Sequence, residues 1–570
     1  MMLIWLKKSH AELWKTVLNY GGLQFRNRPK IYSFFRRRFM WKKGWRQDVW
    51  NTLKSDWDLI VIGGGITGAG VFRRAVAEGY KTLLVDAGDF AFGTSSRSSK
   101  LVHGGFRYLR NKQFEVTRES VREREWMLKE AKYLVTPLGF VMPCPTDPKI
   151  SSQFAIGVVI YDLLAPKWKH SFFTRNKILR QYPEINPNGL KGGFLYYDAE
   201  MDDARLVLHI IREAVAEGGT ALNYSRVEQL LRSKNGSVCG VLLKDQSTAC
   251  SGDFEVKAHV VINATGPWSD DIRGQINAPA RLRRLRGSHL IFPRERLPLP
   301  HAVTLLHPHD RRAMFAIPWE GVTMIGTTDL DHLASLSNGE PFATTDEIEY
   351  ILEAGRATFP SAQLEHSDII STFAGLRPVI NTGIADPSKE SRAHVIWEEE
   401  GLITVTGGKL TTFRIMAEEA LQKAASRLSH PPDLSIRKRY FNPLPNLQAS
   451  GKVLSAELTY LLGRYGIETE ELLNAAHPGE NEPVGILPNL WSEIRWAART
   501  GGVERLDDLL LRRVRIGMLL PDGASAEMSR VRSITQQELG WNDARWEKEE
   551  TRYRTIYENA YSPAPKGFSE

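Results

Sequence analysis

Three glycines and an aspartate near the start of the chain have the types and the spacing that a bound dinucleotide requires. Gly63, Gly65 and Gly68 form a G-x-G-x-x-G motif, and Asp86 follows about 20 residues later. The first glycine of such a motif permits a tight turn, the second lets the backbone approach a pyrophosphate, and the third packs a helix against a strand. The acidic residue can accept hydrogen bonds from a ribose. These residues predict a nucleotide site; the alternative is a glycine-rich structural turn.

The elements around this motif stand in the order that such a site needs. Residues 58–62 form a short apolar run that is typical of a buried parallel strand. Helical periodicity follows over 66–79, so the N–H groups of Ile66 and Thr67 face outward at a helix N-terminus, which attracts phosphate. A second apolar run over 81–85 ends at Asp86. This βαβ unit does not choose between NAD and FAD.

A polar, glycine-bearing loop, TSSRSSKLVHGGFRYL, follows over 94–109. Its hydroxyl and N–H groups could wrap a large cofactor, and a solvated loop is the alternative. The segment closely resembles the signature of FAD-dependent glycerol-3-phosphate dehydrogenases, which are D-amino-acid-oxidase-like flavoproteins. Further blocks resemble the same family in the same order: YYDAEMDDARLVL, VINATGPWSD, RGSHLIFP, IPWEGVTMIGTTD, FAGLRPV and VTGGKLTTFR. The resemblance covers about residues 44–570 and is weaker in the C-terminal part.

The resemblance and the residue patterns together imply a mixed α/β (α+β) protein with three parts. These are a basic aromatic extension over 1–55, an FAD-dependent oxidoreductase with a Rossmann-like FAD-binding domain and an interleaved substrate domain over 56–430, and a helical domain over 431–570. Apolar runs broken by Pro and Gly over 281–328 predict an antiparallel sheet over the flavin. Residues 154–164 are apolar but too short to span a bilayer; a core helix is favoured over a membrane-facing one.

The resemblance implies FAD as the cofactor, held by residues from several blocks. The glycine motif and Asp86, which stands where Glu is common in the family, serve the ADP half, and the Val227 backbone meets adenine. The other implied contacts are Ile66, Thr67, Thr94, Ser95, Ser96, Lys100, Leu101, His103, Gly104, Gly266, Trp268, Gly408 and Lys409.

The substrate that the resemblance implies is sn-glycerol 3-phosphate, oxidised to dihydroxyacetone phosphate by hydride transfer to FAD. A phosphate dianion needs fixed cations, and the guanidinium group offers a bidentate fork. Arg107, Arg377 and, in a looser context, Arg392 match family positions near the substrate. His289 is the best candidate for the proton acceptor by type and by resemblance, with a structural histidine as the alternative. Further matched positions of the catalytic site are Tyr108, Asp329 and Lys409.

The cysteines and histidines give no sign of a metal site or of a disulfide framework. Cys144, Cys239 and Cys250 are scattered, and neither H-E-x-x-H nor an EF-hand loop occurs. We therefore expect no metal and a reducing compartment. The length of 570 residues is sufficient for two or three domains.

The net charge of +9 is concentrated at the N-terminus. Residues 1–55 hold 13 Lys/Arg and 2 Asp/Glu, which leaves 62 basic and 64 acidic residues elsewhere, so no nucleic-acid-binding surface is expected there. The same 55 residues carry five of the 15 Trp, and aromatic residues among cations suit an anionic membrane surface. Lys7 and Lys8 interrupt the apolar run, which excludes a membrane-spanning helix. The alternatives to an interfacial or partner-binding arm are a solvated or packing extension and a targeting signal.

The electron acceptor implied by the resemblance is a membrane quinone. That places the protein in the cytoplasm, peripherally bound to the inner face of the cytoplasmic membrane, and leaves a homodimer open. The nearest alternative is a glycerol-3-phosphate oxidase that reduces oxygen, although that type carries an insertion not evident in this sequence. A wider alternative is an FAD-dependent amino-acid or hydroxy-acid oxidase, and a third is a non-catalytic basic module that binds membranes or nucleic acid.

Overall fold

The computed structural model describes residues 41–105, 114–164, 170–247, 253–336, 339–386, 390–448 and 453–567. The chain divides into two units, Met1–Met40 and Trp41–Glu570. The first unit lies outside the described residues, as do the predicted site residues Arg107 and Tyr108. Within the described ranges, no helix combines the length and the apolar character that crossing a membrane requires.

A largely parallel sheet carries the glycine motif. Its strands run in the order β17 (His394–Glu399), β18 (Leu402–Gly407), β10 (Asp253–Asn263), β1 (Trp57–Ile62), β2 (Thr82–Val85) and β7 (Thr220–Leu222). The pairs from β18 to β7 are parallel, whereas β17 is antiparallel to β18. The hairpin of β8 (Ser225–Arg232) and β9 (Val238–Asp245) joins β10. The strands predicted at 58–62 and 81–85 are confirmed as β1 and β2.

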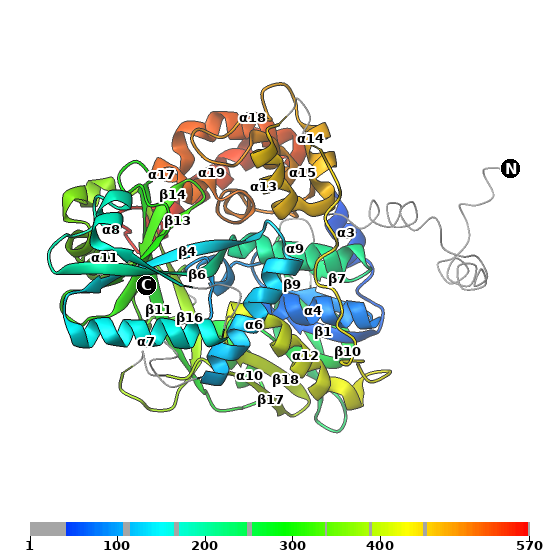
Figure 1. Ribbon diagram of the computed structural model, residues 1–570. Coiled ribbons are helices and arrows are strands. Elements are labelled where there is room, and N and C mark those ends of the chain that lie inside the picture. The colour runs from blue at the N-terminus through cyan, green and yellow to red at the C-terminus, as the bar shows by residue number, and fades with distance from the viewer. Residues whose placement is uncertain are drawn as a thin grey trace. The chain divides into compact units, whose positions relative to one another are not determined.

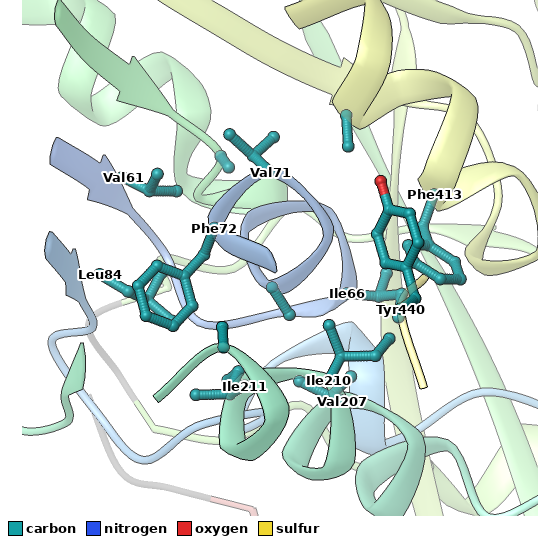
Figure 2. Packing of buried hydrophobic residues seen from close by; sticks show 14 of the residues in the cluster. Val61, Ile66, Val71, Phe72, Leu84, Val207, Ile210, Ile211, Phe413 and Tyr440 are labelled. Atoms are coloured by element: carbon teal, nitrogen blue, oxygen red, sulfur yellow. The ribbon is translucent and has the colours of Figure 1, made fainter. Parts of the chain in front are cut away.

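Three helices cover one face of this sheet: α4 (Ile66–Glu78), α9 (Asp203–Ala216) and α12 (Phe413–Ala424). Phe72 of α4 is fully buried with Leu84 of β2 and Ile211 of α9, and Figure 2 shows these side chains together. Burial of one such ring contributes about 1.5–3 kcal/mol. Gly70 lets α4 approach α12, because a Cβ there would lie 2.8 Å from the Phe413 ring. This packing fixes the start of α4 against the end of β1.

Part of the predicted N-terminal extension packs on the body of the protein. Trp41 stacks on Phe90 with ring centroids 5.1 Å apart, and Trp50 of α3 (Trp45–Trp50) is buried in the core on the other face of the sheet. Arg46 is 2% exposed and pairs with Asp245 at 2.5 Å. These side chains are therefore not available to a membrane surface, and the arm hypothesis narrows to residues 1–40.

The second sheet is mainly antiparallel. Its order is β15 (Leu330–Asp331), β11 (Leu282–Pro293), β14 (Val322–Gly326), β13 (Ala313–Trp319), β12 (Ala302–Leu306), β4 (Val135–Pro145), β6 (Leu190–Met201) and β3 (Leu101–Val102). β16 (Ser371–Ile380) pairs with β11, and β5 (Ser171–Thr174) pairs with β6. The antiparallel sheet predicted over 281–328 is thereby confirmed. The helices α6 (Phe114–Glu130), α8 (Arg175–Gln181) and α11 (Thr345–Thr358) pack against strands of this sheet.

The apolar segment over 154–164 lies in α7 (Pro148–Leu164), which packs on β4 and β6 along one edge of the molecule (Figure 1). Val158 and Tyr161 on its inner side are buried. Ile156, Val159 and Leu163 are 60%, 49% and 78% exposed, so the favoured core placement holds for only one side of the helix.

Helices dominate the C-terminal part, coloured orange to red in Figure 1. They are α13 (Ser455–Tyr465), α14 (Thr469–Ala475), α15 (Trp491–Thr500), η10 (Asp508–Arg513), α16 (Ile516–Leu519), α17 (Pro521–Ala524), α18 (Met528–Leu539) and α19 (Asp543–Ala560). The chain does not continue as one helix from η10 into α16, because Arg515 between them has a φ of +63° and pairs with Asp203. Arg512 and Arg513 also form buried ion pairs with Asp89, which follows β2, so these helices are joined to the part of the protein that carries the parallel sheet.

Candidate active site

A cavity of about 1970 Å³ lies where the carboxyl ends of the parallel strands meet the second sheet. Gly63, Asp86, Gly266 and Gly408 line it, and they follow β1, β2, β10 and β18 respectively. Parallel strands of one sheet end at a common edge, where ligands of such folds bind. The sheet therefore gathers into one wall four residues that are widely separated in the sequence.

The glycine turn has the geometry of a pyrophosphate cradle. Gly63 has a φ of +107°, and a Cβ there would lie 2.6 Å from the carbonyl oxygen of Ala264. A Cβ on Gly68 would lie 1.8 Å from the Gly63 carbonyl oxygen, so any side chain would push α4 away from β1. Gly65, Ile66 and Thr67 at the start of α4 line the cavity, and the Ile66 N–H donates to Ser95 Oγ at 2.9 Å. The N-terminus of α4 and the Ser95 hydroxyl therefore face the cavity together, where an anionic pyrophosphate fits.

Asp86 secures the turn and faces the same cavity. Its carboxylate accepts hydrogen bonds from the N–H groups of Gly64 at 2.6 Å and Gly88 at 2.8 Å. Burial, partly offset by these hydrogen bonds, raises the pKa of Asp86 to about 6. The carboxylate keeps lone pairs that a ribose hydroxyl can use.

FAD is expected to dissociate more readily as the pH falls below about 6. The ionised Asp86 is the better acceptor for ribose hydroxyls, and its pKa of about 6 means that protonation sets in there, at up to about tenfold in affinity per pH unit. Fluorescence of released FAD at equilibrium would measure this affinity. Asp86→Glu should keep the pH dependence and Asp86→Asn should lose it; parallel curves for wild type and Asp86→Asn would exclude Asp86 as its source.

The loop after β2 is held from behind by a buried ion pair. Lys100 Nζ donates to the Ser96 carbonyl at 2.6 Å and to the Asp203 carboxylate at 2.9 Å. Burial is the main cause that lowers the pKa of Lys100 to about 7. The Thr94 hydroxyl donates to the Leu376 carbonyl of β16, which ties the loop to the second sheet. Lys100 thus positions the loop and does not itself reach the cavity wall.

Most of the predicted cofactor and substrate residues with described positions line this one cavity. They are Gly63, Gly65, Ile66, Thr67, Asp86, Thr94, Ser95, Leu101, His103, Val227, Gly266, Trp268, Asp329, Arg377, Arg392, Gly408 and Lys409. Gly68, Ser96, Lys100, Gly104 and His289 lie behind the wall. Gly104 is there because its N–H donates to Tyr161 Oη and a Cβ would lie 2.5 Å from that oxygen.

Three arginines of the cavity wall surround one carboxylate. Arg312, Arg377 and Arg392 contact Asp329 at 3.3, 3.2 and 3.0 Å. Asp329 is buried, and one terminal nitrogen of Arg392, Nη1, is buried without a hydrogen-bond partner among the described residues. The four side chains carry a formal charge of +2, which matches a phosphate monoester dianion.

Two glycines on adjacent strands make room for this cluster. A Cβ on Gly287 of β11 would lie 2.3 Å from an Arg377 nitrogen, so the guanidinium lies across that glycine. Gly375 of β16, which pairs with Gly287, lines the cavity, and the carbonyl of Arg97 lies against it. At these two glycines the sheet therefore leaves space for the loop after β2, which carries Arg97, and for the guanidinium of Arg377.

His289 of β11 follows Gly287 by two residues and is not part of the cavity wall. The ring is 1% exposed and stacks on Phe373 with centroids 4.6 Å apart. Burial, together with the charges of Arg377 and Lys100, holds the pKa of His289 well below its ordinary value. The imidazole is therefore neutral near pH 7, and its role as proton acceptor stays a prediction.

Comparison with known proteins identifies the family. A model described as FAD dependent oxidoreductase (DAO) matches residues 58–422, and one described as the C-terminal domain of alpha-glycerophosphate oxidase matches residues 417–546. An aerobic glycerol-3-phosphate dehydrogenase of Staphylococcus aureus is 34% identical over 505 residues, covering 82% of this chain and 88% of the relative. The chain belongs to the glycerol-3-phosphate dehydrogenase family of FAD-dependent oxidoreductases. The family resemblance and the mixed α/β fold inferred from the sequence are confirmed.

Solved structures agree with this family assignment. The glycerol-3-phosphate dehydrogenase from Bacillus halodurans complexed with FAD is 28% identical, with a TM-score of 0.72 over 93% of this chain and 100% of that chain. The FAD-bound L-α-glycerophosphate oxidase from Mycoplasma pneumoniae has a TM-score of 0.52 over 69% of this chain and 100% of its own, but at 17% identity it supports the fold alone. FAD is the cofactor of this chain, as the sequence predicted.

Arg312 and Ser99 belong to the site but were not predicted from the sequence, whereas Asp329 was. Arg312 precedes β13 and Asp329 follows β14, and the hairpin brings these ends together. A basic residue before one strand of a hairpin and an acidic residue after the other would have been the signal. Ser99 was passed over among the neighbouring serines; it lines the cavity and contacts His289.

Proposed function

We propose that this protein oxidises sn-glycerol 3-phosphate to dihydroxyacetone phosphate with bound FAD. The observation that carries the proposal is the +2 cluster of Arg312, Arg377, Arg392 and Asp329, which lines the same cavity as the FAD cradle. The names of the relatives from S. aureus and B. halodurans support the same substrate. A neutral or monoanionic substrate would leave more of this positive charge uncompensated.

Different residues of the cavity bind the substrate phosphate and hold the cofactor. The arginines hold the phosphate, and Asp329 fixes the directions in which their N–H groups point. When bound in the cradle of Gly63, Gly65 and Asp86, FAD would supply the acceptor for the hydride from C2 of the substrate. The Lys409 ammonium, which donates to Ser120 Oγ at 2.6 Å, is held beside Gly408 at the same wall. Arg107 and Tyr108 stay predicted members of the substrate site.

Anaerobic bleaching tests the proposal directly. Glycerol 3-phosphate added to the yellow holoenzyme without oxygen should bleach the flavin band, whereas glycerol, which lacks the phosphate, should bleach it far more slowly. A flavin that stays oxidised with glycerol 3-phosphate would refute the assignment. Bleaching by amino acids or hydroxy acids at a comparable rate would favour the wider oxidase alternative.

We propose a membrane quinone as the electron acceptor. Ile156 and Ile160 of α7 line the cavity, and Val159 and Leu163 of the same helix are 49% and 78% exposed, so one helix presents apolar side chains both to the cavity and to the surface. The basic, aromatic residues 1–40 support attachment to an anionic membrane, and thereby a peripheral location at its inner face. Oxygen is the second candidate, because the C-terminal match carries the name of an oxidase. Reoxidation of the bleached enzyme by a quinone, and much more slowly by oxygen, would select the dehydrogenase.

Polar substitution on α7 is expected to weaken vesicle binding. Val159→Ser with Leu163→Ser removes two exposed apolar side chains, each of which contributes roughly 1 kcal/mol of transfer free energy. Co-sedimentation with anionic vesicles measures the effect, and deletion of residues 1–40 tests the arm in parallel. Anaerobic bleaching by glycerol 3-phosphate should remain unchanged in the α7 variant. Full vesicle retention in both variants would refute the membrane proposal.

A further inference from the structure

Ser99 stands between the cavity and the buried imidazole of His289. Its side chain lines the cavity, whereas His289 lies behind the wall. Ser99 Oγ is 2.8 Å from His289 Nε2. Among the described residues, this hydroxyl is the polar group that links the imidazole to the cavity.

The surroundings hold both members of this pair in place. The His289 ring is parallel to Phe373 within 9°, and a Cβ on Gly326 would lie 2.3 Å from the ring, so the ring is enclosed on two sides. The backbone before Ser99 rests on Gly375, and the next residue, Lys100, is tied to Asp203. The imidazole is therefore held in place, and the backbone on both sides of Ser99 is fixed beside it.

The charges around His289 determine its protonation state. Arg377 of β16 and Lys100, which follows Ser99, are the cations that face it, and Asp203 pairs with Lys100. Burial and these cations lower the pKa of His289, so the neutral ring has a lone pair that can accept a proton. Nε2 is the ring atom that contacts Ser99, so a proton that passes between them binds at Nε2. The neutral ring then carries its own proton on Nδ1, which is buried with no hydrogen-bond partner among the described residues. A phosphate dianion bound to Arg377 would offset one of the two cations and make the ring a better base.

We propose that Ser99 is a catalytic residue that relays the proton of the substrate hydroxyl to His289. The inference rests on the proposed function and adds the acceptor of the proton. The O–H bond at C2 of the substrate breaks as a new O–H bond forms on Ser99, and the original Ser99 proton bonds to His289 Nε2. The electron pair of the C2–H bond leaves with the hydride, for which FAD is the acceptor. The proton leaves His289 again after oxidation, favoured by the cations near the ring.

Substitution of Ser99 tests the relay in the holoenzyme. Ser99→Ala should slow anaerobic flavin bleaching by about 100-fold or more, the range of general base catalysis. The dissociation constant for glycerol 3-phosphate, obtained from the concentration dependence of bleaching, should change by less than about threefold, because the arginines bind the phosphate. Ser99→Thr keeps the hydroxyl and should recover most of the rate. His289→Gln combined with Ser99→Ala should be no slower than either variant alone, since both act in one step.

A second hydroxyl–histidine pair provides the matched control. Tyr182 Oη lies 2.6 Å from His301 Nδ1, and neither residue lines the cavity. Tyr182→Phe should bleach at the wild-type rate. If wild type bleaches and Ser99→Ala bleaches equally fast, the relay is wrong while the proposed function stands; if wild type fails to bleach, the function itself fails.

The imidazole can also be observed without turnover. In holoenzyme with isotope-labelled histidines, the resonance lost in His289→Gln identifies the ring. That resonance should show a neutral ring at pH values down to about 6.5, the ordinary histidine pKa, and it should shift in Ser99→Ala but not in Tyr182→Phe. A ring that is charged at neutral pH, or a resonance that Ser99→Ala leaves unchanged, would overturn the proposal.

Discussion

Arg377→Ala is expected to lower kcat/KM for glycerol 3-phosphate by roughly 100-fold. The guanidinium holds Asp329 at 3.2 Å and donates to Thr327 Oγ1 at 3.1 Å, and it lines the cavity where the phosphate is proposed to bind. Removing one partner of a buried, charge-assisted contact costs about 3 kcal/mol, and each 1.36 kcal/mol corresponds to a factor of ten. Most of the effect should appear in KM, because the arginine binds the phosphate before and during the reaction.

Two further variants locate the effect in the guanidinium fork. Arg377→Lys keeps the charge but loses the bidentate geometry, so it should recover only part of the affinity. Arg283→Ala removes an arginine from the adjacent strand β11 that pairs with Asp331 and is not part of the cavity wall, so it should leave KM within about twofold. Steady-state kinetics with glycerol 3-phosphate and with glycerol measure the preference for phosphate. An Arg377→Ala enzyme with the wild-type preference would show that the phosphate binds elsewhere.

The local features of the FAD side could be predicted because they depend on residues close in the sequence. The run before Gly63, the helix after it and the strand that ends at Asp86 are set by periodicity and by glycine geometry, and the structure places all of them at the cavity edge. The edge itself follows from a general property of parallel sheets. For this part of the site, the sequence pattern alone is therefore sufficient to place the residues at the cavity.

The substrate side depends on strand pairing, which single-sequence patterns do not specify. His289 was expected to meet the substrate, but the pairing of β11 with β16 puts it beside Phe373 and beneath the loop that carries Ser99. Arg312 acquires its place only when the β13–β14 hairpin closes next to Asp329. For α7, apolar composition favoured the core, but composition alone does not tell which side of the helix faces the sheet.

Long-range contacts also shorten the predicted N-terminal extension from residues 1–55 to residues 1–40. Tryptophans and basic residues over 1–55 have one composition, but Trp41, Arg46 and Trp50 find buried partners in the body of the protein. Arg46 reaches Asp245, a residue that only the β8–β9 hairpin brings near. Composition alone therefore suggested that these side chains lie at a membrane surface, whereas they are packed inside the protein.

Gly63→Ala is expected to abolish FAD retention. The residue has a φ of +107°, a region that a side chain strongly disfavours, and a Cβ would lie 2.6 Å from the Ala264 carbonyl oxygen at the end of β10. The turn would have to open, which would move the N-terminus of α4 away from the pyrophosphate position. The ratio of flavin to protein absorbance after purification measures the loss, and circular dichroism tests whether the fold persists.

Gly79→Ala separates the effect of the site from that of backbone strain. Gly79 caps the other end of α4 with a φ of +94°, but a Cβ there would meet nothing within 4 Å. The substitution should cost about 1 kcal/mol in the free energy of unfolding and leave the FAD content at the wild-type level. Equal FAD loss in both variants would mean that α4 is destabilised as a whole. Loss confined to Gly63→Ala would locate the pyrophosphate at the turn between β1 and α4, because Gly63 combines a positive φ with a backbone atom in the way and Gly79 does not.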